Sequence, residues 1–534
     1  MTAQINLTKN SDDFSQGTAT IWFWSVAGFF AVLWVILPGI FHTAYRITDV
    51  IELQGNAKEW VLATRKHPLL SAWILEIVNI ITGRIFVAPF IASQICVIIS
   101  LWSVWQLGRK VLSEKLALIG ALAVLPYYFF SYHSLVYNQN STLIAFWSLS
   151  VYLVFQAYQT NRILYWILSG LSIGITFHAK YPAALLVLSI LIFMFTQPEG
   201  RKRWYGIGPY LTTIIAIIIF TPHIIWLYQN DFATFDFARH RFIPSNQISC
   251  IILPLFFILY QTEYWLPIVI ILYPALGFVW QWRFGTFKNE NEKQCAKYLF
   301  YCFIIPFLIC IVIMVIKNCW LPATYTAPFW TYLGIWLLLR FRTKNLSNTF
   351  SRTIKLVVVL ETVMVMMLLC GVFTPYLNGK AKKQLFATND FGVKCDQIWY
   401  SRFETPCCYA TGDWALCGYA CYAMRDRPSL HYYWNMYDGG IGNMNAKPSG
   451  AWATDEDVNQ KGGIIVWKIS DGGESNNSDN SNNSDDYVPD WVYKRFPKAE
   501  IIPDPIILPY KTKAKVPPIK IGIAIIPPPQ NYER

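Results

Sequence analysis

Charged side chains recur at helical spacing in a segment that begins at residue 46. Arg46 and Asp49 are three residues apart, Glu52 follows one helical turn later, and Lys66 and His67 come after a short gap. One or two carboxylates and several cations would therefore meet if this segment folds back on itself. Such a set suits acid–base chemistry beside an anionic group. The simplest alternatives are a solvated helix face for Asp49 and a lipid-headgroup contact for Lys66.

Two further segments place polar groups between apolar runs. Lys180 and Tyr181 interrupt the apolar sequence at residues 177–182, and His223 lies in an apolar run that leads to Arg239. Charged groups that must lie near a bilayer are functional candidates by default. The alternatives are snorkelling for Lys180 and simple packing for His223. Nucleotide-binding loops and hydrolase or metalloprotease motifs are absent from the sequence, so those activities lack support.

The composition is that of a membrane protein. Of the 534 residues, 54% are hydrophobic and 14% are charged, against about 45–50% and about 25% in soluble domains. The mean hydropathy is +0.33. The net charge of +12 does not indicate nucleic-acid binding, because residues 376–534 contain eighteen Lys and Arg and eighteen Asp and Glu. The whole excess lies in the apolar part, where it indicates topology.

Windows of the length that a bilayer needs recur throughout residues 21–375. The first window is too long and its flank too weakly basic for a cleavable signal peptide, so we expect it to remain as an anchor. We predict eleven transmembrane helices, at residues 21–41, 85–107, 115–132, 142–158, 163–178, 181–196, 207–227, 264–282, 298–316, 323–339 and 356–374.

The loops predict the orientation. With the N-terminal tail, residues 1–20, in the cytoplasm, the loops on the same side hold sixteen Lys and Arg, against nine in the opposite loops. The positive-inside rule selects this arrangement. An odd number of spans then places the C-terminal domain, residues 376–534, outside the cytoplasm.

Segments outside the spans have their own patterns. Residues 42–84 form the first external loop, and we expect two interfacial helices there because its apolar residues follow a helical stripe. A third interfacial helix is expected at 248–262. The C-terminal domain alternates short apolar runs with turns, which predicts strands in a small α/β domain. Residues 470–486 contain only Ser, Asn, Asp, Gly and Glu and predict a disordered loop.

Several motifs, taken together, resemble a known group of enzymes. TDVIELQGNAKEW, KHPLLSAWI, YNQNSTLIAFWSLSVY, GLSIGITFHAKYPA, FTPHIIWLYQNDFATFDFARHR and CWLPATYTAPFW are similar, in order and spacing, to rhizobial-type lipid A and lipopolysaccharide (LPS) core galacturonosyltransferases. These belong with aminoarabinose transferases and protein O-mannosyltransferases in the GT-C superfamily. The resemblance covers about residues 20–375 and extends weakly into the C-terminal domain through YATGDWALCGYACYAMRDRPS.

The resemblance implies a GT-C fold and a transferase. One sugar would pass from a polyprenyl-phosphate donor to lipid A, LPS core or another envelope acceptor, on the periplasmic face of the bacterial inner membrane. The implied site residues are the catalytic acid Asp49 with its partner Glu52, the donor-phosphate ligands Lys66, Lys180, Arg46 and Arg239, and the substrate-binding residues His67, Tyr181, Asn138 and His223.

Acid–base chemistry at the membrane surface fits these residues. We expect Asp49 to act as general base on an acceptor hydroxyl, while Lys66 and Lys180 stabilise the departing phosphate. If the acceptor group is already a phosphate, Asp49 would bind or orient it. No metal is required, although a divalent metal is compatible. Aminoarabinose transferases carry Glu-Lys-Pro where this chain has Lys66-His67-Pro68, which weakens the case for a carboxylate-bound metal.

Other functions remain open on sequence alone. A membrane transporter or lipid flippase would also be polytopic, but internal repeats and midplane charges, which are typical of transporters, are not found. Protein O-glycosylation is a second alternative, with protein in place of LPS as the acceptor. The bilayer is an expected partner and nucleic acid is not.

Overall fold

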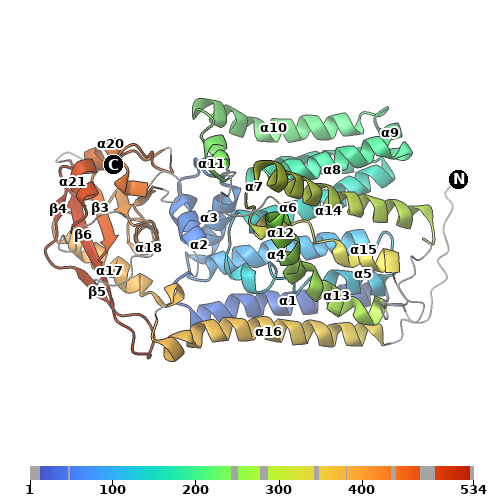
Figure 1. Cartoon of the computed structure of the whole chain (residues 1–534), viewed down its shortest axis with the longest axis horizontal. Coiled ribbons are helices and arrows are strands. Elements are labelled where there is room, and N and C mark those ends of the chain that lie inside the picture. Colours follow the sequence, from blue (N-terminus) through green and yellow to red (C-terminus); the bar gives the residue numbers. More distant parts are fainter. Residues whose placement is uncertain are drawn as a thin grey trace.

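The computed structural model of the chain describes residues 13–45, 48–241, 251–276, 287–341, 348–380, 382–433, 440–450, 452–469 and 488–529. A bundle of long helices forms most of the molecule, and a smaller domain with a β-sheet lies at one end (Figure 1). Helices α2 (Thr48–Ala57) and α3 (Leu70–Thr82) lie between these two parts. The predictions for Arg46 and for the loop at 470–486 concern residues outside the described ranges.

The bundle is built from apolar helices, as its sequence predicts. Its other helices are α1 Gln16–Phe41, α4 Ala88–Gly108, α5 Glu114–Leu122, α6 Gln139–Thr160, α7 Ile163–Ala179, α8 Ala183–Thr196, α9 Pro198–Arg203, α10 Gly208–Gln229, α11 Ala233–Arg241, α12 Ile252–Tyr260, α13 Thr262–Leu276, α14 Glu290–Lys317, α15 Leu333–Phe341 and α16 Thr349–Asn378. Seven segments of the described chain are long and apolar enough to cross a bilayer: α1, α4, α6, α10, α12 with α13, α14 and α16. The chain is a multi-pass membrane protein.

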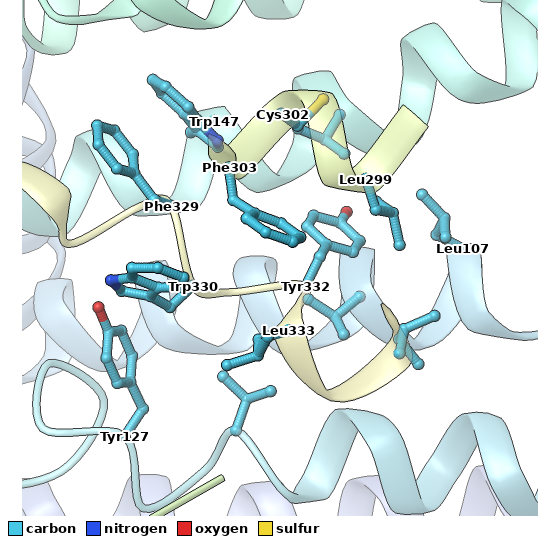
Figure 2. Close-up of a cluster of buried hydrophobic side chains, with 14 of the residues drawn as sticks. Leu107, Tyr127, Trp147, Leu299, Cys302, Phe303, Phe329, Trp330, Tyr332 and Leu333 are labelled. Atoms are coloured by element: carbon cyan, nitrogen blue, oxygen red, sulfur yellow. The ribbon is translucent and has the colours of Figure 1, made fainter. Parts of the chain in front are cut away.

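Two of the eleven predicted spans, 115–132 and 323–339, are not continuous helices. Helix α5 stops at Leu122, and the second segment is a short 3₁₀ turn, Ala323–Thr326, followed by α15. The two segments contact each other, and the Tyr127 hydroxyl donates to the Ala327 carbonyl oxygen at 2.8 Å. Irregular backbone is tolerated at membrane depth when it is buried in protein. Figure 2 shows Phe329, Trp330, Tyr332 and Leu333 packed among side chains of α6 and α14.

The interfacial helix predicted at 248–262 is instead the first half of a longer apolar stretch. Helices α12 and α13 follow each other with a break at Gln261. The Gln261 side-chain oxygen accepts hydrogen bonds from the Thr326 hydroxyl at 2.5 Å and the Trp330 indole at 3.0 Å. The irregular segment 323–332 thus provides partners for a polar side chain that hydropathy alone assigns to the surface.

Close packing of α7 against α10 positions the loop that carries Lys180. A Cβ added at Gly170 would lie 2.7 Å from a backbone oxygen of α10, and one at Gly174 would lie 2.8 Å from Ile219. Small residues let membrane helices approach closely. The contact brings His178, at the end of α7 and two residues before Lys180, to His223 of α10, with ring centroids 5.9 Å apart.

The C-terminal domain is a small α/β domain, as predicted. Its elements are α17 Thr388–Tyr400, β1 Tyr409–Gly412, α18 Trp414–Ala423, β2 Ser429–His431, α20 Asp455–Lys461, β3 Gly463–Lys468, α21 Asp490–Arg495, β4 Glu500–Ile501, β5 Ile506–Leu508 and β6 Ile519–Ile526. The sheet order is β2-β1-β3-β6-β4, with β5 also paired to β6. Strands β1, β2 and β3 are parallel, and β6 is antiparallel to β3.

Helices cover both faces of this sheet, which explains why β3 and β6 are apolar at successive positions. On β3, Ile464 and Val466 pack in the cluster with α17 and α18. Ile465 and Trp467 pack in a second cluster, with Val492 of α21.

The core of the C-terminal domain continues into the membrane part. Val50 and Ile51 of α2 belong to the same buried apolar cluster as Leu416 and Leu430 of the C-terminal domain. A Cβ at Gly418 would lie 2.0 Å from the Ile51 side chain. Glycine is therefore required where α18 meets α2. The domain boundary predicted at residue 375 separates two compositions but not two independent cores.

Candidate active site

A tight turn between α2 and α3 directs Lys66 back toward α2. The Thr64 hydroxyl accepts the backbone N–H groups of Lys66 at 3.1 Å and of His67 at 3.2 Å. The backbone N–H of Thr64 donates to the His67 carbonyl oxygen at 3.0 Å. Local hydrogen bonds of a Thr side chain therefore fix the turn that positions the ammonium group.

Four predicted residues meet at this point. The Lys66 ammonium lies 3.0 Å from the Glu52 carboxylate and 3.8 Å from the Asp49 carboxylate. The Asn138 side-chain amide donates to the other Asp49 oxygen at 3.2 Å. We call Asp49, Glu52, Lys66 and Asn138 the carboxylate cluster. Helix α2, the turn that follows it and the start of α6 contribute to it, and Asn138 is 89 residues from Asp49 in the sequence.

The start of α6 connects the carboxylate cluster to Lys180. The Asn138 side-chain oxygen caps α6, while its amide nitrogen binds Asp49. Two residues on, the Asn140 side-chain oxygen accepts a hydrogen bond from the Lys180 ammonium at 2.8 Å. Lys180 also lies 4.9 Å from the centre of the Tyr325 ring. The two predicted phosphate-binding lysines therefore flank one helix N-terminus, which itself favours anions.

The two carboxylates differ in how deeply they are buried. The Glu52 side chain is 2% exposed, whereas that of Asp49 is 34% exposed. Burial raises the pKa of Glu52; the Lys66 ammonium opposes this shift and the Asp49 carboxylate reinforces it. Glu52 is placed to hold Lys66, and Asp49 is the more accessible of the two carboxylates.

The C-terminal domain closes one side of the carboxylate cluster. The Lys66 ammonium lies 5.6 Å from the centre of the Trp414 ring, which begins α18. The backbone N–H of Arg65 donates to the Ser449 carbonyl oxygen at 3.1 Å. The carboxyl end of strand β1, just before Trp414, therefore faces the membrane part, as is usual for sites in parallel sheets.

An ion pair fastens the two parts together beside the carboxylate cluster. Both guanidinium nitrogens of Arg427 donate to the Glu76 carboxylate of α3 at 2.8 Å. Burial would raise the pKa of Glu76, but hydrogen bonds from Arg427 and Asn79 bring it below the ordinary value. This bidentate pair fixes α3 relative to the C-terminal domain.

Two other predicted residues form a separate cluster. The Tyr181 hydroxyl is hydrogen bonded to His223 Nε2 at 2.8 Å and to the Thr234 hydroxyl at 3.0 Å. We call Tyr181, His223 and Thr234 the tyrosine–histidine cluster. Burial raises the pKa of Tyr181 to about 12, so its hydroxyl is neutral. Tyr181 directly follows Lys180, which connects the two clusters along the chain.

The remaining predictions, His67 and Arg239, involve α11. The His67 ring contacts Phe237 of α11 with ring centroids 5.6 Å apart. Arg239 is exposed and pairs with Asp236, one turn earlier on the same helix, at 3.3 Å. The structure thus places α11 against the Lys66 turn without bringing the Arg239 guanidinium into the carboxylate cluster.

Metal binding has no geometric basis in the described residues. Within those ranges, three or more His, Cys, Asp or Glu side chains do not come together in a group that could hold an ion. At the position where two carboxylates do meet, the Lys66 ammonium lies beside both. A metal ion there would have to compete with the Lys66 ammonium for the two carboxylates.

Sequence reasoning did not find Asn140, Thr64 or Trp414. Asn140 stands two residues after Asn138 at a helix start, so the repeated Asn was an available signal. Thr64, two residues before Lys66, is typical of a turn. Trp414 is distant in the sequence, and only the packing of α18 on α2 reveals its position.

Parts of the sequence match known glycosyltransferases. A family model for dolichyl-phosphate-mannose-protein mannosyltransferases matches residues 66–226. The LPS core galacturonosyltransferase RgtA of Rhizobium johnstonii is 29% identical over 173 residues, which cover 32% of this chain and 35% of RgtA. RgtB of the same organism is 25% identical over 213 residues, covering 38% and 42%. The chain thus matches less than half of the length of either relative.

Two solved structures of ArnT from Cupriavidus metallidurans share the fold. ArnT bound to undecaprenyl phosphate has a TM-score of 0.53 at 11% identity, and apo ArnT has 0.54 at 13%. Both superpositions cover 96% of this chain and 99% of ArnT. At such identity the likeness shows the fold, and it extends over the C-terminal domain. The predicted helical membrane fold with a small C-terminal α/β domain and the predicted resemblance are confirmed, and the count of eleven spans stays a prediction.

Proposed function

We propose that this chain, a member of the GT-C superfamily, is a membrane glycosyltransferase that moves one sugar from a polyprenyl-phosphate donor to a lipid A or LPS core acceptor. The observation that carries the proposal is the carboxylate cluster. It places a reachable carboxylate, Asp49, next to a buried cation, Lys66, at the end of the membrane helices. A lipid-linked donor cannot leave the bilayer, so its phosphate must be bound at this depth.

An apolar groove gives the donor lipid a route to the carboxylate cluster. The groove has a volume of about 380 Å³ and is lined by Leu62, Leu70, Trp73, Ile175, His178, Ile218, Ile219 and Pro222. Leu62 and Leu70 flank the turn that carries Lys66, and His178 lies two residues before Lys180. An isoprenoid chain in this groove would place its phosphate between the two lysines.

Asp49 acts as general base in the proposed reaction. Its carboxylate takes the proton of the acceptor hydroxyl as the oxygen attacks the anomeric carbon, the bond from this carbon to the phosphate oxygen breaks, and a glycosidic bond forms. Lys66 and Lys180 stabilise the negative charge on the departing polyprenyl phosphate. Glu52 is a positioning residue that holds Lys66. Where the acceptor is a phosphate, Asp49 orients it instead.

The acceptor and the location follow from the relatives and from charge. Both curated relatives are named as LPS core galacturonosyltransferases, which supports an LPS acceptor and a bacterial inner membrane. The N-terminal end of α1 and helix α9, with its cluster of Arg and Lys, lie opposite the C-terminal domain (Figure 1). The positive-inside rule then supports a periplasmic C-terminal domain and active site.

Metal ions are not required in this proposal. Two lysines can neutralise a monophosphate leaving group, and Lys66 already lies beside the two carboxylates. We expect transfer by the purified protein to continue in excess EDTA. Loss of transfer in EDTA that added Mg²⁺ or Mn²⁺ restores would contradict this expectation.

Glycan analysis tests the proposed function. A strain that lacks the gene is complemented with wild type, with Asp49→Asn, or with Asp236→Asn as a control carboxylate on exposed α11. Mass spectrometry of lipid A and core should show one sugar missing in the deletion strain and restored by wild type and Asp236→Asn only. An unchanged glycan profile in the deletion strain would contradict the LPS acceptor.

Protein O-glycosylation is the second candidate, because the matching family model describes protein mannosyltransferases. It predicts unchanged lipid A and core together with loss of hexose from periplasmic proteins. A glycoproteome of the same strains separates the two acceptors. If wild type and Asp49→Asn restore the glycans equally, the proposed catalytic role of Asp49 is wrong for either acceptor.

A further inference from the structure

Two segments that are distant in the sequence lie side by side where α16 leaves the bundle. The backbone N–H of Lys511 donates to the Leu385 carbonyl oxygen at 2.8 Å. A Cβ at Gly379 would lie 4.0 Å from the Lys515 carbonyl oxygen. In Figure 1 the chain beyond β5 descends to the end of α16. Residues 379–380 and 382–383 therefore lie beside residues 511–515 and share one surface with them.

This surface is strongly basic. The two segments contain six lysines and no Asp or Glu: Lys380, Lys382, Lys383, Lys511, Lys513 and Lys515. We call these six residues the lysine strip. All are exposed except Lys382, which is half-buried. Asp390 pairs with Lys511 at 2.6 Å. Residues 376–534 contain equal numbers of basic and acidic residues. The strip therefore concentrates positive charge on one part of a domain that has no net charge.

The lysine strip lies at the depth of lipid headgroups. From Leu356 to Leu377, α16 has one charged residue, Glu361, which is buried. This stretch is about 33 Å long at the usual helical rise, enough to cross the hydrocarbon core. At its end Leu377 is 87% exposed and Tyr376 is 52% exposed. Exposed apolar and aromatic side chains followed directly by lysines mark a membrane–water interface.

We propose that the lysine strip binds the phosphate groups of anionic phospholipids in the leaflet from which α16 emerges. The occupant follows from position and charge, since the strip faces headgroups wherever α16 spans a bilayer. Lys511, Lys513 and Lys515 are all exposed, so each ammonium is available to a separate phosphate. Clusters of basic residues at a membrane surface favour anionic lipids.

Such binding would hold the C-terminal domain in place over the carboxylate cluster. The Gln384 carbonyl oxygen, inside the strip, accepts the backbone N–H groups of Thr43 at 2.9 Å and Ala44 at 3.1 Å. These residues connect α1 to α2, which carries Asp49. The strip is therefore joined to both the bilayer and the helix that carries the base.

Native mass spectrometry of the full-length protein tests the proposal independently of its activity. Purified wild type and Lys511→Gln/Lys513→Gln/Lys515→Gln are titrated with phosphatidylglycerol and with phosphatidylcholine. A surface lysine near anionic lipid changes binding about fivefold, so the triple substitution should weaken phosphatidylglycerol binding at least about tenfold. Phosphatidylcholine binding should be equal in both proteins, and inorganic phosphate should not displace the lipid.

The matched control is Lys461→Gln/Lys494→Gln/Lys498→Gln, which removes three lysines of the same domain outside the strip, in α20, in α21 and just before β4. It should bind phosphatidylglycerol like wild type. Equal lipid binding by wild type and both variants would overturn the proposal. It would also be overturned if the strip variant bound phosphatidylglycerol normally but lost binding of purified LPS core, because the strip would then recognise acceptor phosphates.

Discussion

The carboxylate cluster and the tyrosine–histidine cluster are linked through Lys180, which contacts Asn140 at the start of α6 and directly precedes Tyr181, but they differ in charge and in what surrounds them. The carboxylate cluster joins two carboxylates to Lys66 and is covered by Trp414 of the C-terminal domain. The tyrosine–histidine cluster is built from α10, α11 and the turn after α7, and its Tyr181 hydroxyl is neutral. A position next to Lys180 in the sequence is therefore not enough to place a side chain beside the two carboxylates.

Charge sets the expected consequences of substitution. Removing one partner of a buried ion pair leaves an uncompensated charge, whereas removing one neutral hydroxyl loses an ordinary hydrogen bond. Under our proposal, substitutions in the carboxylate cluster should affect both catalysis and stability. Those in the tyrosine–histidine cluster should affect orientation alone.

The largest effect is expected for Asp49→Asn in the purified enzyme. The substitution keeps the size of the side chain and removes the base, so kcat should fall about 10²- to 10⁴-fold. Donor KM should change little, because the lysines remain. Steady-state transfer from a polyprenyl-phosphate sugar measures both constants. A decrease in kcat of less than about threefold would show that another group is the base. Asp236→Asn serves as the control.

The next largest effect is expected for Lys66→Gln, which leaves Glu52 buried without its cation. The free energy of unfolding should fall by about 3–5 kcal/mol, measured by denaturation in mixed micelles. The double variant Glu52→Gln/Lys66→Gln should recover most of that stability but none of the activity. Recovery of both would show that Lys66 is structural.

An exposed ion pair on α14 provides the control for these stability measurements. Glu290 and Lys293 are 3.1 Å apart and mostly exposed. Lys293→Gln should change the free energy of unfolding by less than about 0.5 kcal/mol, because surface ion pairs contribute little.

A smaller effect is expected for Arg427→Gln, which loosens the C-terminal domain from α3. Stability at neutral pH should fall by about 2–3 kcal/mol, since Arg427 is better solvated than Lys66. In wild type the folded pKa of Glu76 is lowered. The contribution of the Arg427–Glu76 ion pair to stability is therefore complete above the pKa of Glu76 in the unfolded chain. It is lost as the pH falls through the pKa of Glu76 in the folded protein.

Unfolding of wild type and Arg427→Gln across acidic pH measures this difference. The two stability curves should converge as the pH falls, because Glu76 becomes protonated in both proteins. Curves that stay parallel would show that the Arg427 side chain contributes by packing alone.

The smallest effect is expected for Tyr181→Phe. The loss of one neutral hydroxyl should reduce kcat/KM less than about tenfold. Because burial raises the pKa of Tyr181 to about 12, the ratio of variant to wild type should stay constant across the neutral pH range. Tyr205→Phe, at a position 92% exposed, is the control. A reduction as large as that of Asp49→Asn would erase the distinction between the two clusters.

Several elements of the fold could be predicted because their residues are sufficient by themselves. A run of apolar residues long enough for a bilayer forms a helix wherever it is inserted, as α1, α14 and α16 do. Strands β3 and β6 were also recognisable from their apolar runs and flanking turns. The breaks in the predicted spans at 115–132 and 323–339 could not be predicted, because each segment is broken where it packs against the other.

The candidate site divides in the same way. Helical spacing, which depends on neighbouring residues only, grouped Asp49 with Glu52, and the family resemblance implied their roles. The structure adds that Glu52 is buried and Asp49 reachable, and this depends on how Lys66 and the C-terminal domain cover α2. The resemblance grouped Arg239 with the lysines, yet α11 turns it toward Asp236 and solvent.

The sequence by itself determined that this chain is a multi-pass membrane protein with a small α/β domain, and which charged residues lie near the membrane surface. Composition and periodicity are local properties, so they suffice for these conclusions. Only the tertiary structure decided that Asn138 contacts Asp49, that Asn140 contacts Lys180 and that Trp414 lies over Lys66. These contacts join residues from separate helices, and their geometry arises from packing that no single segment contains.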